Sequence, residues 1–381
     1  MNYDAIVVGG GVVGMSIAYH LVGAGARTLL LDRADTGRAT DAGAGILTAE
    51  TNGHASDAWL DFAAAAADYY PHLVARLAAA GAGETGYAVC GQLAVALDQD
   101  EVAPFERARE WMLAQQRRRG SPAPEDLRDI TADDARALFP PLARVRRALY
   151  YRNAARVDGR LLTEALRRAA ITGGLAAHSA SVDRLRIKDG AVTGVLADGH
   201  THQAGAVVIA GGAWSPRFAQ QLGVQIPVAP LRGQIAHLSL PGVATDGWPL
   251  VTAFHGHYLV AWPDQRVVAG ATQEPDAGFE ARTSAGGVHE VLSEALRIAP
   301  GLRDADIREV RVGLRPYSTV DGLPVLGPAP GLRNAYLATG HGAYGLHLGP
   351  YSGKLVAGLM LGAPIGAELS MFSVGRFSAI S

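Results

Sequence analysis

The chain has 381 residues, of which 49% are hydrophobic and 18% are charged. This composition is typical of a folded globular protein and excludes a disordered one, and the length allows two or three domains. The net charge of −2 argues against a nucleic-acid-binding protein, because such proteins carry an excess of positive charge where they meet phosphates.

Cys90 is the single cysteine, so no internal disulfide can form and a disulfide framework is excluded. No apolar run reaches the roughly 18 residues needed to cross a bilayer. The first strand pattern begins at residue 4, with no charged leader before it. We therefore expect a cytoplasmic protein without a transmembrane segment. Peripheral contact with a membrane stays open, and so does the oligomeric state.

The N-terminal stretch predicts a βαβ unit that holds a dinucleotide. Residues 4–8 are apolar, Gly9-x-Gly11-x-x-Gly14 follows them, and a helical pattern leads to a second apolar run that ends at Asp32. Such glycines permit a tight turn, close approach of the backbone to a pyrophosphate, and packing of the helix on the strand. The helix N-terminus then faces the phosphates, and the acid binds a ribose hydroxyl. The alternative is an ordinary strand–turn–helix unit that binds nothing.

Three further stretches fit a nucleotide site. Residues 36–47 are small and glycine-rich, which allows a flat ligand to approach the backbone, although a plain surface loop has the same composition. An apolar run at residues 206–210 ends in paired glycines, and residues 335–361 repeat the order strand, glycine loop, helix. The polar residues 50–56 are interpreted as a lid.

Hydrophobic periodicity predicts the elements of the chain. Helices are expected at residues 56–80 (as one helix or two), 101–119, 131–139, 159–172, 287–298 and 350–361. Strands are expected at residues 86–97, 148–153, 176–179, 182–195 (a hairpin that turns at Asp189-Gly190), 206–210, 227–240, 258–262, 266–271, 308–314 and 335–339. The less regular block that begins at residue 86 indicates a second domain inserted into the first.

Four motifs make the pattern more specific: Thr40-Asp-Ala-Gly-Ala-Gly-Ile46, Gly313-Leu-Arg-Pro316, Asp321-Gly-Leu-Pro-Val-Leu-Gly327 and Ala338-Thr-Gly-His341. Together with the N-terminal glycine turn, the chain resembles the FAD-dependent D-amino-acid oxidase superfamily, and within it the branch of glycine oxidases and D-amino-acid dehydrogenases. The resemblance covers the whole chain. The glycine turn alone does not separate FAD enzymes from NAD enzymes, but the N-terminal and C-terminal motifs together do.

The resemblance implies an α/β fold, α+β overall, in which a discontinuous Rossmann-like FAD-binding domain carries an inserted substrate domain. The FAD-binding domain would comprise residues 1–85, 151–217 and 311–381. The substrate domain would comprise residues 86–150 and 218–310, with a mixed or antiparallel sheet that covers one face of the flavin.

The resemblance also implies which residues contact FAD. Ala44, Gly45 and Ile46 would lie near the reactive edge of the flavin, and Val182 would contact the adenine side through its backbone. The residues expected to contact the cofactor are Gly9, Gly11, Val12, Val13, Gly14, Asp32, Arg33, Thr40, Ala44, Gly45, Ile46, Val182, Gly211, Gly212, Trp214, Gly313, Arg315, Gly340, His341, Gly342, Ala343, Tyr344 and Gly345.

Arg315, Tyr258 and His341 are the candidate catalytic residues that the resemblance implies. Arg315 would clamp the substrate carboxylate and Tyr258 would help to hold it, whereas a surface arginine and a half-buried strand aromatic are the plainer interpretations. His341 would polarise the flavin edge or cap a loop. Glycine oxidases usually carry an arginine in the loop after Gly-His. This chain has Ala343 there, so its inner substrate pocket would be lined differently.

FAD is expected to be held without a covalent bond. Some sarcosine oxidases of the superfamily attach FAD through a cysteine in the C-terminal half, and no cysteine follows Cys90 here. No metal is expected, because His255 and His257 lack the partners of a metal site.

The implied reaction is oxidation of the Cα–N bond of a small amino acid, which would be glycine, a D-amino acid or an N-alkyl amino acid. Hydride would pass from Cα to flavin N5, and the imine would hydrolyse to a 2-oxo acid. The C-terminal helix, expected to begin near residue 350, would stabilise negative charge on the reduced flavin. Oxygen or a quinone would take the electrons, and a quinone would be consistent with membrane contact.

Three other functions stay open. The first is a secondary-amine enzyme that acts on proline or hydroxyproline isomers, which a substrate panel would distinguish from an oxidase of small amino acids. A flavoprotein subunit of an electron-transfer complex, without turnover, would stay oxidised with every amino acid. An NAD-dependent dehydrogenase would show no flavin spectrum.

Overall fold

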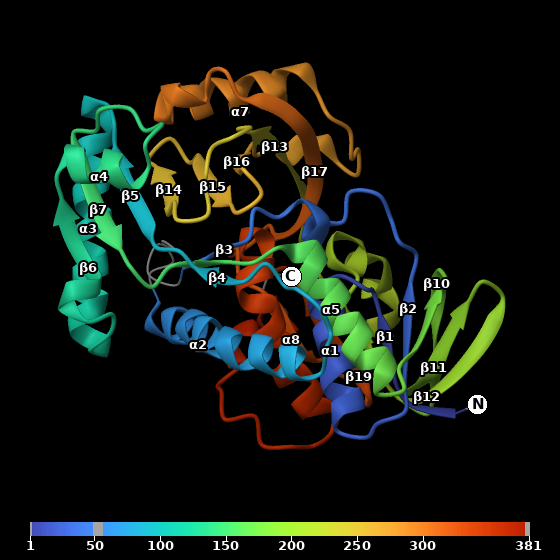
Figure 1. Cartoon of the computed structure of the whole chain (residues 1–381). Helices are drawn as coiled ribbons and strands as arrows, with labels where there is room; N and C mark the ends of the chain where they lie inside the picture. The colour runs from blue at the N-terminus through green and yellow to red at the C-terminus, as the bar shows by residue number, and fades with distance from the viewer. Residues whose placement is uncertain (1, 49–55, 378–381) are drawn as a thin grey trace.

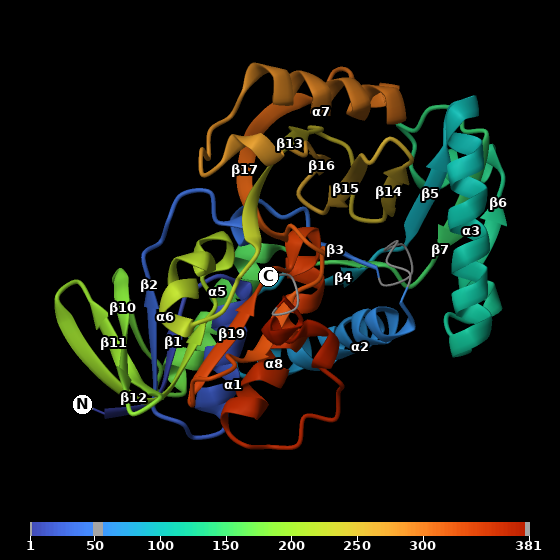
Figure 2. The same cartoon turned by 180° about the vertical axis from the view of Figure 1, so that it is seen from behind.

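The structure, a computed structural model, describes residues 2–48 and 56–377. The chain forms two lobes that meet along one face, and Figures 1 and 2 show them from opposite sides. The predicted lid at residues 50–56 lies outside the described residues except for Ser56, whose side chain caps the helix that follows.

A Rossmann-like sheet forms the centre of the lower lobe in Figure 1. Its strands are β1 (Asn2–Val8), β2 (Thr28–Asp32), β9 (Ala176–Ser179), β10 (Val182–Lys188), β11 (Ala191–Ala197), β12 (His200–Ile209), β18 (Val325–Pro328) and β19 (Ala335–Thr339). The parallel part runs in the order β9, β2, β1, β12, β19. The start, the middle and the end of the chain therefore meet in one sheet.

Both faces of this sheet are buried, which explains why its central strands are continuous apolar runs. Val7 and Leu30 pack in one core with the helices, whereas Ile6 and Leu29 pack in a second core on the opposite face. The helices of the first core are α1 (Val12–Gly23), α2 (Asp57–Ala79), α5 (Gly159–Thr172) and α8 (Gly345–Met360).

A mostly antiparallel sheet forms the upper lobe, in the order β17, β13, β16, β15, β14, β5, β7, β6. Its strands are β5 (Gln92–Ala96), β6 (Leu127–Ile130), β7 (Arg147–Tyr151), β13 (Val228–Ser239), β14 (Leu250–Ala253), β15 (Tyr258–Trp262), β16 (Arg266–Gly270) and β17 (Asp306–Ser318). Three helices accompany it: α3 (Gln99–Arg119), α4 (Ala132–Leu138) and α7 (Ala285–Ile298). The parallel pair β5–β14 joins the two chain segments that build this lobe.

These two sheets confirm the predicted fold class, a discontinuous Rossmann-like domain with an inserted domain on a mixed sheet. A small third sheet, β3 (Ile46–Leu47), β8 (Ala155–Arg156) and β4 (Ala88–Val89), lies where the chain passes from one lobe to the other. The five domain segments stay a prediction. Strand β17 crosses the boundary expected between residues 310 and 311.

Three predicted elements need correction. The strand expected over residues 86–97 is split into β4 and β5, because Gly91 between them has a φ of +76°. As a result Cys90 lies between strands and is half-buried. Strand β17 continues to Ser318 through Pro316, which is tolerated because β17 is an edge strand.

The C-terminal helix also begins earlier than predicted, at Gly345 and not near Pro350. A proline inside a helix leaves the carbonyl four residues earlier without its usual N–H donor. Here that carbonyl belongs to Leu346, and the hydroxyl of Tyr70 on α2 donates to it. The helix therefore continues through the proline with the help of a neighbouring helix.

In residues 2–48 and 56–377, no helix is both long enough and apolar enough to cross a bilayer. The cytoplasmic location expected from the sequence stays a prediction.

Candidate active site

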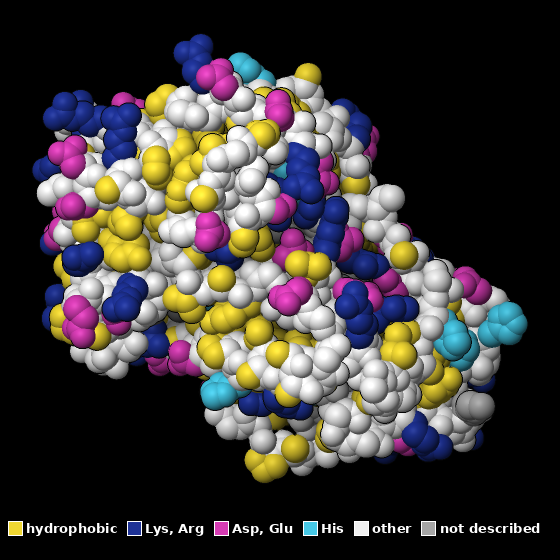
Figure 3. All heavy atoms as spheres, viewed as in Figure 1, with side chains coloured by type: hydrophobic (Ala, Val, Ile, Leu, Met, Phe, Trp, Pro, Cys, Tyr) yellow, Lys and Arg dark blue, Asp and Glu magenta, His cyan; other side chains and the backbone are white. Residues whose placement is uncertain are grey.

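A cavity of about 960 Å³ lies between the two lobes and is lined by both. The lower lobe contributes the β1–α1 turn, residues 38–48 and the loop before α8, and the upper lobe contributes β13, β15, β17 and α3. Figure 3 shows basic and acidic side chains gathered near the junction of the lobes. The volume is at the upper end of the range for cofactor and ligand sites.

The β1–α1 turn has the geometry that its glycines predict. Gly9 has a φ of +111°, and a Cβ added there would lie 2.4 Å from the Ala210 carbonyl oxygen. A Cβ at Gly14 would lie 1.9 Å from the Gly9 carbonyl oxygen. The backbone N–H of Val12 donates to Thr40 Oγ1 at 3.1 Å, which ties residues 39–42 to the start of α1. Side chains would fill this cradle, so glycines leave it open to a pyrophosphate.

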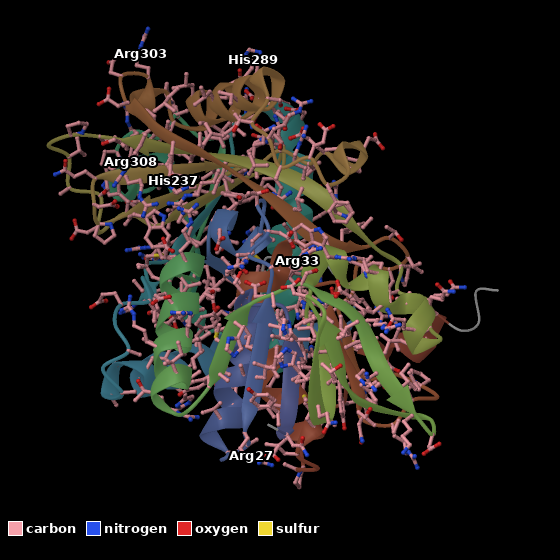
Figure 4. All side chains as sticks on the ribbon, turned by 90° about the vertical axis from the view of Figure 1, so that its right-hand side faces the viewer. Arg27, Arg33, His237, His289, Arg303 and Arg308 are labelled. Atoms are coloured by element: carbon pink, nitrogen blue, oxygen red, sulfur yellow. The ribbon has the colours of Figure 1, made fainter. Side chains whose placement is uncertain are left out.

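Charged residues surround the end of β2. Asp32 forms an ion pair with Arg38, and Arg33 forms one with Asp35 at 2.6 Å. All four line the cavity, and Figure 4 shows Arg33 at the level where the two lobes meet. Arg38 was not among the expected site residues, because its partner Asp32 is recognisable only when the loop folds back on β2. The Asp32 carboxylate has oxygen acceptors beyond the one that Arg38 engages, so the pair leaves room for ribose hydroxyls.

The residues expected near the flavin edge lie on the cavity wall. Gly45 has a φ of +84°, and a Cβ there would lie 1.8 Å from the Val157 carbonyl oxygen, so only glycine fits. His341 is buried, and its Nε2 is 3.1 Å from Ser352 Oγ on α8. Burial lowers the pKa of His341 to about 4, so the imidazole is neutral near pH 7.

Arg315 and Tyr258 come together at the upper-lobe end of the cavity. Arg315 Nη1 donates to the Thr272 carbonyl at 3.1 Å, and the guanidinium lies over Gly233, where an added Cβ would be 2.3 Å from both terminal nitrogens. Burial raises the pKa of Tyr258, and the neighbouring Arg315 opposes that shift. The phenol is therefore a neutral hydrogen-bond donor beside a fixed cation.

Most residues that the sequence singled out line this cavity. Gly14 and Gly340 do not: Gly14 lies in α1 and lets it approach the Gly9 backbone, and Gly340, with a φ of +75°, lies in the turn after β19. The other expected residues that line it are Gly9, Gly11, Val12, Val13, Asp32, Arg33, Thr40, Ala44, Gly45, Ile46, Val182, Gly211, Gly212, Trp214, Tyr258, Gly313, Arg315, His341, Gly342, Ala343, Tyr344 and Gly345. Their roles toward a ligand stay predictions.

Helix α3 contributes residues to the cavity that were not expected from the sequence. This helix places Arg107, Ala108, Trp111 and Met112 on the cavity wall, at the spacing of one helix face. The apolar members of that stripe recur at helical spacing, which is a signal visible in the sequence. Thr252 to Phe254, at the end of β14, lie on the same wall.

The two histidines beside Tyr258 have acidic neighbours. His255 Nε2 lies 3.2 Å from Asp100, and His257 Nε2 lies 3.4 Å from Glu290. Within the residues that the structure describes, no group of three or more histidine, cysteine or acidic side chains is arranged to hold a metal ion.

The chain matches the family of FAD-dependent oxidoreductases named DAO over residues 4–359. It belongs to this family. The protein is therefore an FAD-dependent oxidoreductase, and the alternative of an NAD-dependent dehydrogenase is wrong. The glycine cradle, the acid after β2 and the glycine-lined wall at Gly45 all fit FAD.

Known proteins are similar to this chain along nearly its whole length. An uncharacterized oxidoreductase of Bacillus subtilis, YurR, is 38% identical and covers 96% of this chain and 97% of its own. The crystal structure of iminodiacetate oxidase from Chelativorans sp. BNC1 is 38% identical, with a TM-score of 0.91 and coverage of 97% and 98%. That of glycine oxidase from Geobacillus kaustophilus is 29% identical, with a TM-score of 0.90 and coverage of 98% and 99%. The resemblance to glycine oxidases is thereby confirmed.

Proposed function

We propose that this protein oxidises the Cα–N bond of a small amino acid, with glycine or an N-substituted glycine as the preferred class. The observation that carries the proposal is the cation of Arg315, which is held against the Thr272 carbonyl in a cavity shared by both lobes. Similarity to a glycine oxidase and to an iminodiacetate oxidase supports the choice of substrate.

Arg315 would bind the substrate carboxylate through two parallel N–H donors, which fixes the direction of the Cα–N bond. Tyr258 would donate from its neutral hydroxyl to the same carboxylate. Residues 44–46 and the loop at residues 341–345 would hold the flavin ring between the lobes. When bound, FAD supplies the two-electron acceptor. The protein then needs to bind, orient and shield the amine.

His341 would act as a structural residue beside the flavin. Its Nε2 faces Ser352 Oγ, and its lowered pKa keeps it uncharged. We propose that it holds the loop before α8 in place, so that this loop and the start of α8 face the cofactor. Of the two roles expected from the sequence, the geometry favours loop capping.

A secondary amine is favoured over a primary one. Ala343 stands where glycine oxidases usually have an arginine, and its short side chain lines the cavity. A methyl group leaves more room for a substituent on the substrate nitrogen. The similarity to iminodiacetate oxidase, at 38% identity, points the same way. A cyclic imino acid of the proline type stays a second candidate within this class.

We propose that FAD is held without a covalent bond. Cys90 lies between β4 and β5 and is absent from the described cavity wall. Acid precipitation should leave all flavin in the supernatant and colourless protein in the pellet. Flavin that stays with the pellet would contradict this.

The decisive experiment mixes the purified yellow protein with amines in the absence of air. Glycine and N-substituted glycines should bleach the visible flavin band, and aldehyde or 2-oxo acid product should form in equal amount. Admission of air, or of a quinone, then identifies the acceptor. A flavin that stays oxidised with every primary and secondary amino acid would contradict the proposal and favour a flavoprotein without turnover.

A further inference from the structure

Besides Arg315, the upper lobe places Arg107 on the wall of the cavity, from a different element. Arg107 projects from α3, on the same helix face as Ala108, Trp111 and Met112, and all four line the cavity. Its side chain is exposed, so it stands at the mouth of the cavity.

Arg107 differs from its neighbours on the helix in having no ionic partner among the described residues. Arg109 forms an ion pair with Asp129 at 2.5 Å, and Arg118 forms one with Asp61 at 2.7 Å. No hydrogen bond or ion pair of Arg107 is formed within residues 2–48 and 56–377. A cation on a cavity wall without a protein partner is available to a ligand.

The charges on the described cavity wall are distributed unevenly. Its acidic residues are Asp32 and Asp35, at the end of β2, and both already form ion pairs with arginines. The end formed by the upper lobe carries Arg107 and Arg315 and no acidic residue among those described. One substrate carboxylate would neutralise the positive charge of Arg315. The positive charge of Arg107 would still have no partner.

We propose that the substrate is a dicarboxylic amine and that Arg107 binds its second carboxylate. This inference rests on the proposed function. Trp111 lies one helical turn after Arg107 and offers an apolar surface to the short carbon chain between the two carboxylates. Arg107 would be a specificity-determining residue, and Arg315 would bind the carboxylate next to the reacting carbon.

The second carboxylate has two possible positions on the substrate. It lies on the nitrogen substituent in N-carboxymethylglycine and on the side chain in D-aspartate. In the first case, loss of the Cα–H and N–H bonds passes two electrons and two protons to the flavin. Water then adds to the C=N bond, the C–N bond breaks, and glyoxylate and glycine leave. In the second case the same steps give oxaloacetate and ammonium. Oxygen or a quinone reoxidises the flavin.

The test compares substrates that differ in one carboxylate. For the unmodified holoenzyme, kcat/KM should be higher for N-carboxymethylglycine than for N-methylglycine, or higher for D-aspartate than for D-alanine. Arg107→Gln should lower that preference by roughly 10- to 100-fold, the worth of a charge-assisted hydrogen bond. Flavin content should stay the same, and kcat/KM for the monocarboxylic partner should fall less than kcat/KM for the dicarboxylic substrate. Arg107→Lys should restore part of the preference.

Arg117→Gln is the matched control. Arg117 is an exposed arginine on the same helix, it does not line the cavity, and its substitution removes the same charge. The control should keep the preference of the unmodified enzyme. A preference that survives Arg107→Gln, or that falls equally in the control, would overturn the role of Arg107.

The two proposals fail in different ways. If monocarboxylic amines bleach the flavin as efficiently as dicarboxylic ones, the proposed function stands and the dicarboxylic substrate is wrong. If no amine of either kind bleaches it, the proposed function itself is wrong. The two substrate pairs also locate the second carboxylate. A larger preference within the N-carboxymethylglycine pair places it on the nitrogen substituent, and a larger preference within the D-aspartate pair places it on the side chain.

Discussion

Gly233 gives the sharpest test of the position of Arg315. A Cβ at this site would lie 2.3 Å from both terminal nitrogens of the guanidinium, so Gly233→Ala must displace the charged group. The backbone itself accepts alanine, because the site requires no positive φ. We expect KM for the amino acid to rise roughly 10- to 100-fold, as for the loss of a charge-assisted hydrogen bond. Steady-state kinetics at full flavin occupancy measures this.

Gly247→Ala is the control for that substitution, since an added Cβ there has no neighbour within 4 Å. Its kinetics should match those of the unmodified enzyme. If Gly233→Ala also leaves KM unchanged while the flavin stays bound, Arg315 does not hold the carboxylate. In that case Arg315→Leu would also leave KM for the amino acid unchanged.

Tyr258 should contribute less than Arg315. Tyr258→Phe removes one neutral donor, so we expect KM to rise roughly two- to tenfold. Because burial raises the pKa of Tyr258, its hydroxyl keeps its proton at neutral and mildly alkaline pH. The ratio of KM between variant and parent should therefore be constant from pH 7 to about 9. A ratio that falls toward one as the pH rises would indicate an ionising phenol.

At the scale of residues, the sequence located Arg315 through the motif around it, but not what holds it. Gly233 lies on β13 and Thr272 follows β16, so these partners meet Arg315 only after the strands pair. The same holds for Arg107, because few residues of α3 are buried and only the fold shows which of them meet the cavity. Motifs report residues near one another in the chain, whereas a cavity collects residues from several elements.

At the scale of elements, α8 shows how a neighbour can override a local signal. Pro350 predicted a helix start, and the structure supplies the missing donor from Tyr70 on α2. Tyr70→Phe would leave the buried Leu346 carbonyl without a partner. We expect a loss of about 1–3 kcal/mol in the free energy of unfolding, measured by urea denaturation.

Tyr336→Phe is a suitable control for Tyr70→Phe, because the Tyr336 hydroxyl has no hydrogen-bond partner among the described residues. This variant should unfold at the same urea concentration as the parent, within a few tenths of a kcal/mol. Equal stability of the two variants would mean that water, and not Tyr70, satisfies the carbonyl.

The start of α1 gives a second test at this scale. Thr40→Val removes the acceptor of the Val12 N–H and frees residues 39–42 from the helix. The dissociation constant for FAD should rise roughly two- to tenfold, since one neutral hydrogen bond orders this part of the cradle. Thr40→Ser keeps the hydroxyl and should bind FAD normally. Tighter binding by Thr40→Val would show that the freed N–H serves the phosphates better.

At the scale of the whole molecule, the sequence indicated three separate parts of a nucleotide site, because each part has its own glycine signal, and the family resemblance implied that they form one domain. It did not predict the parallel pairing of β5 with β14, which unites the upper lobe. Both strands are short apolar runs without a motif, and their partners lie far away in the chain. Such pairings depend on how the whole sheet closes, which local periodicity does not encode.

Buried histidines make the stability of the whole fold sensitive to acid. Burial lowers the pKa of His20 and His237 to about 3 and that of His341 and His347 to about 4. In the unfolded chain these histidines bind protons once the pH falls below 6.5, the ordinary pKa of histidine. In the folded chain they stay unprotonated until the pH is much lower. Stability should therefore fall as the pH drops from about 6.5 toward 4, by up to about 1.4 kcal/mol per pH unit for each such residue. His255, whose pKa is raised, opposes this effect.

Melting temperatures measured between pH 7.5 and 5 would show this loss before most carboxylates take up protons. His20→Gln keeps a side chain able to bond the Tyr69 hydroxyl but removes one titrating group, so its melting temperature should fall less steeply with acid. His289→Gln is the control, because His289 lies exposed on α7, as Figure 4 shows, and its substitution should leave the slope unchanged. A parent protein that melts at the same temperature from pH 7 to 5 would mean that these histidines are hydrated in the folded state.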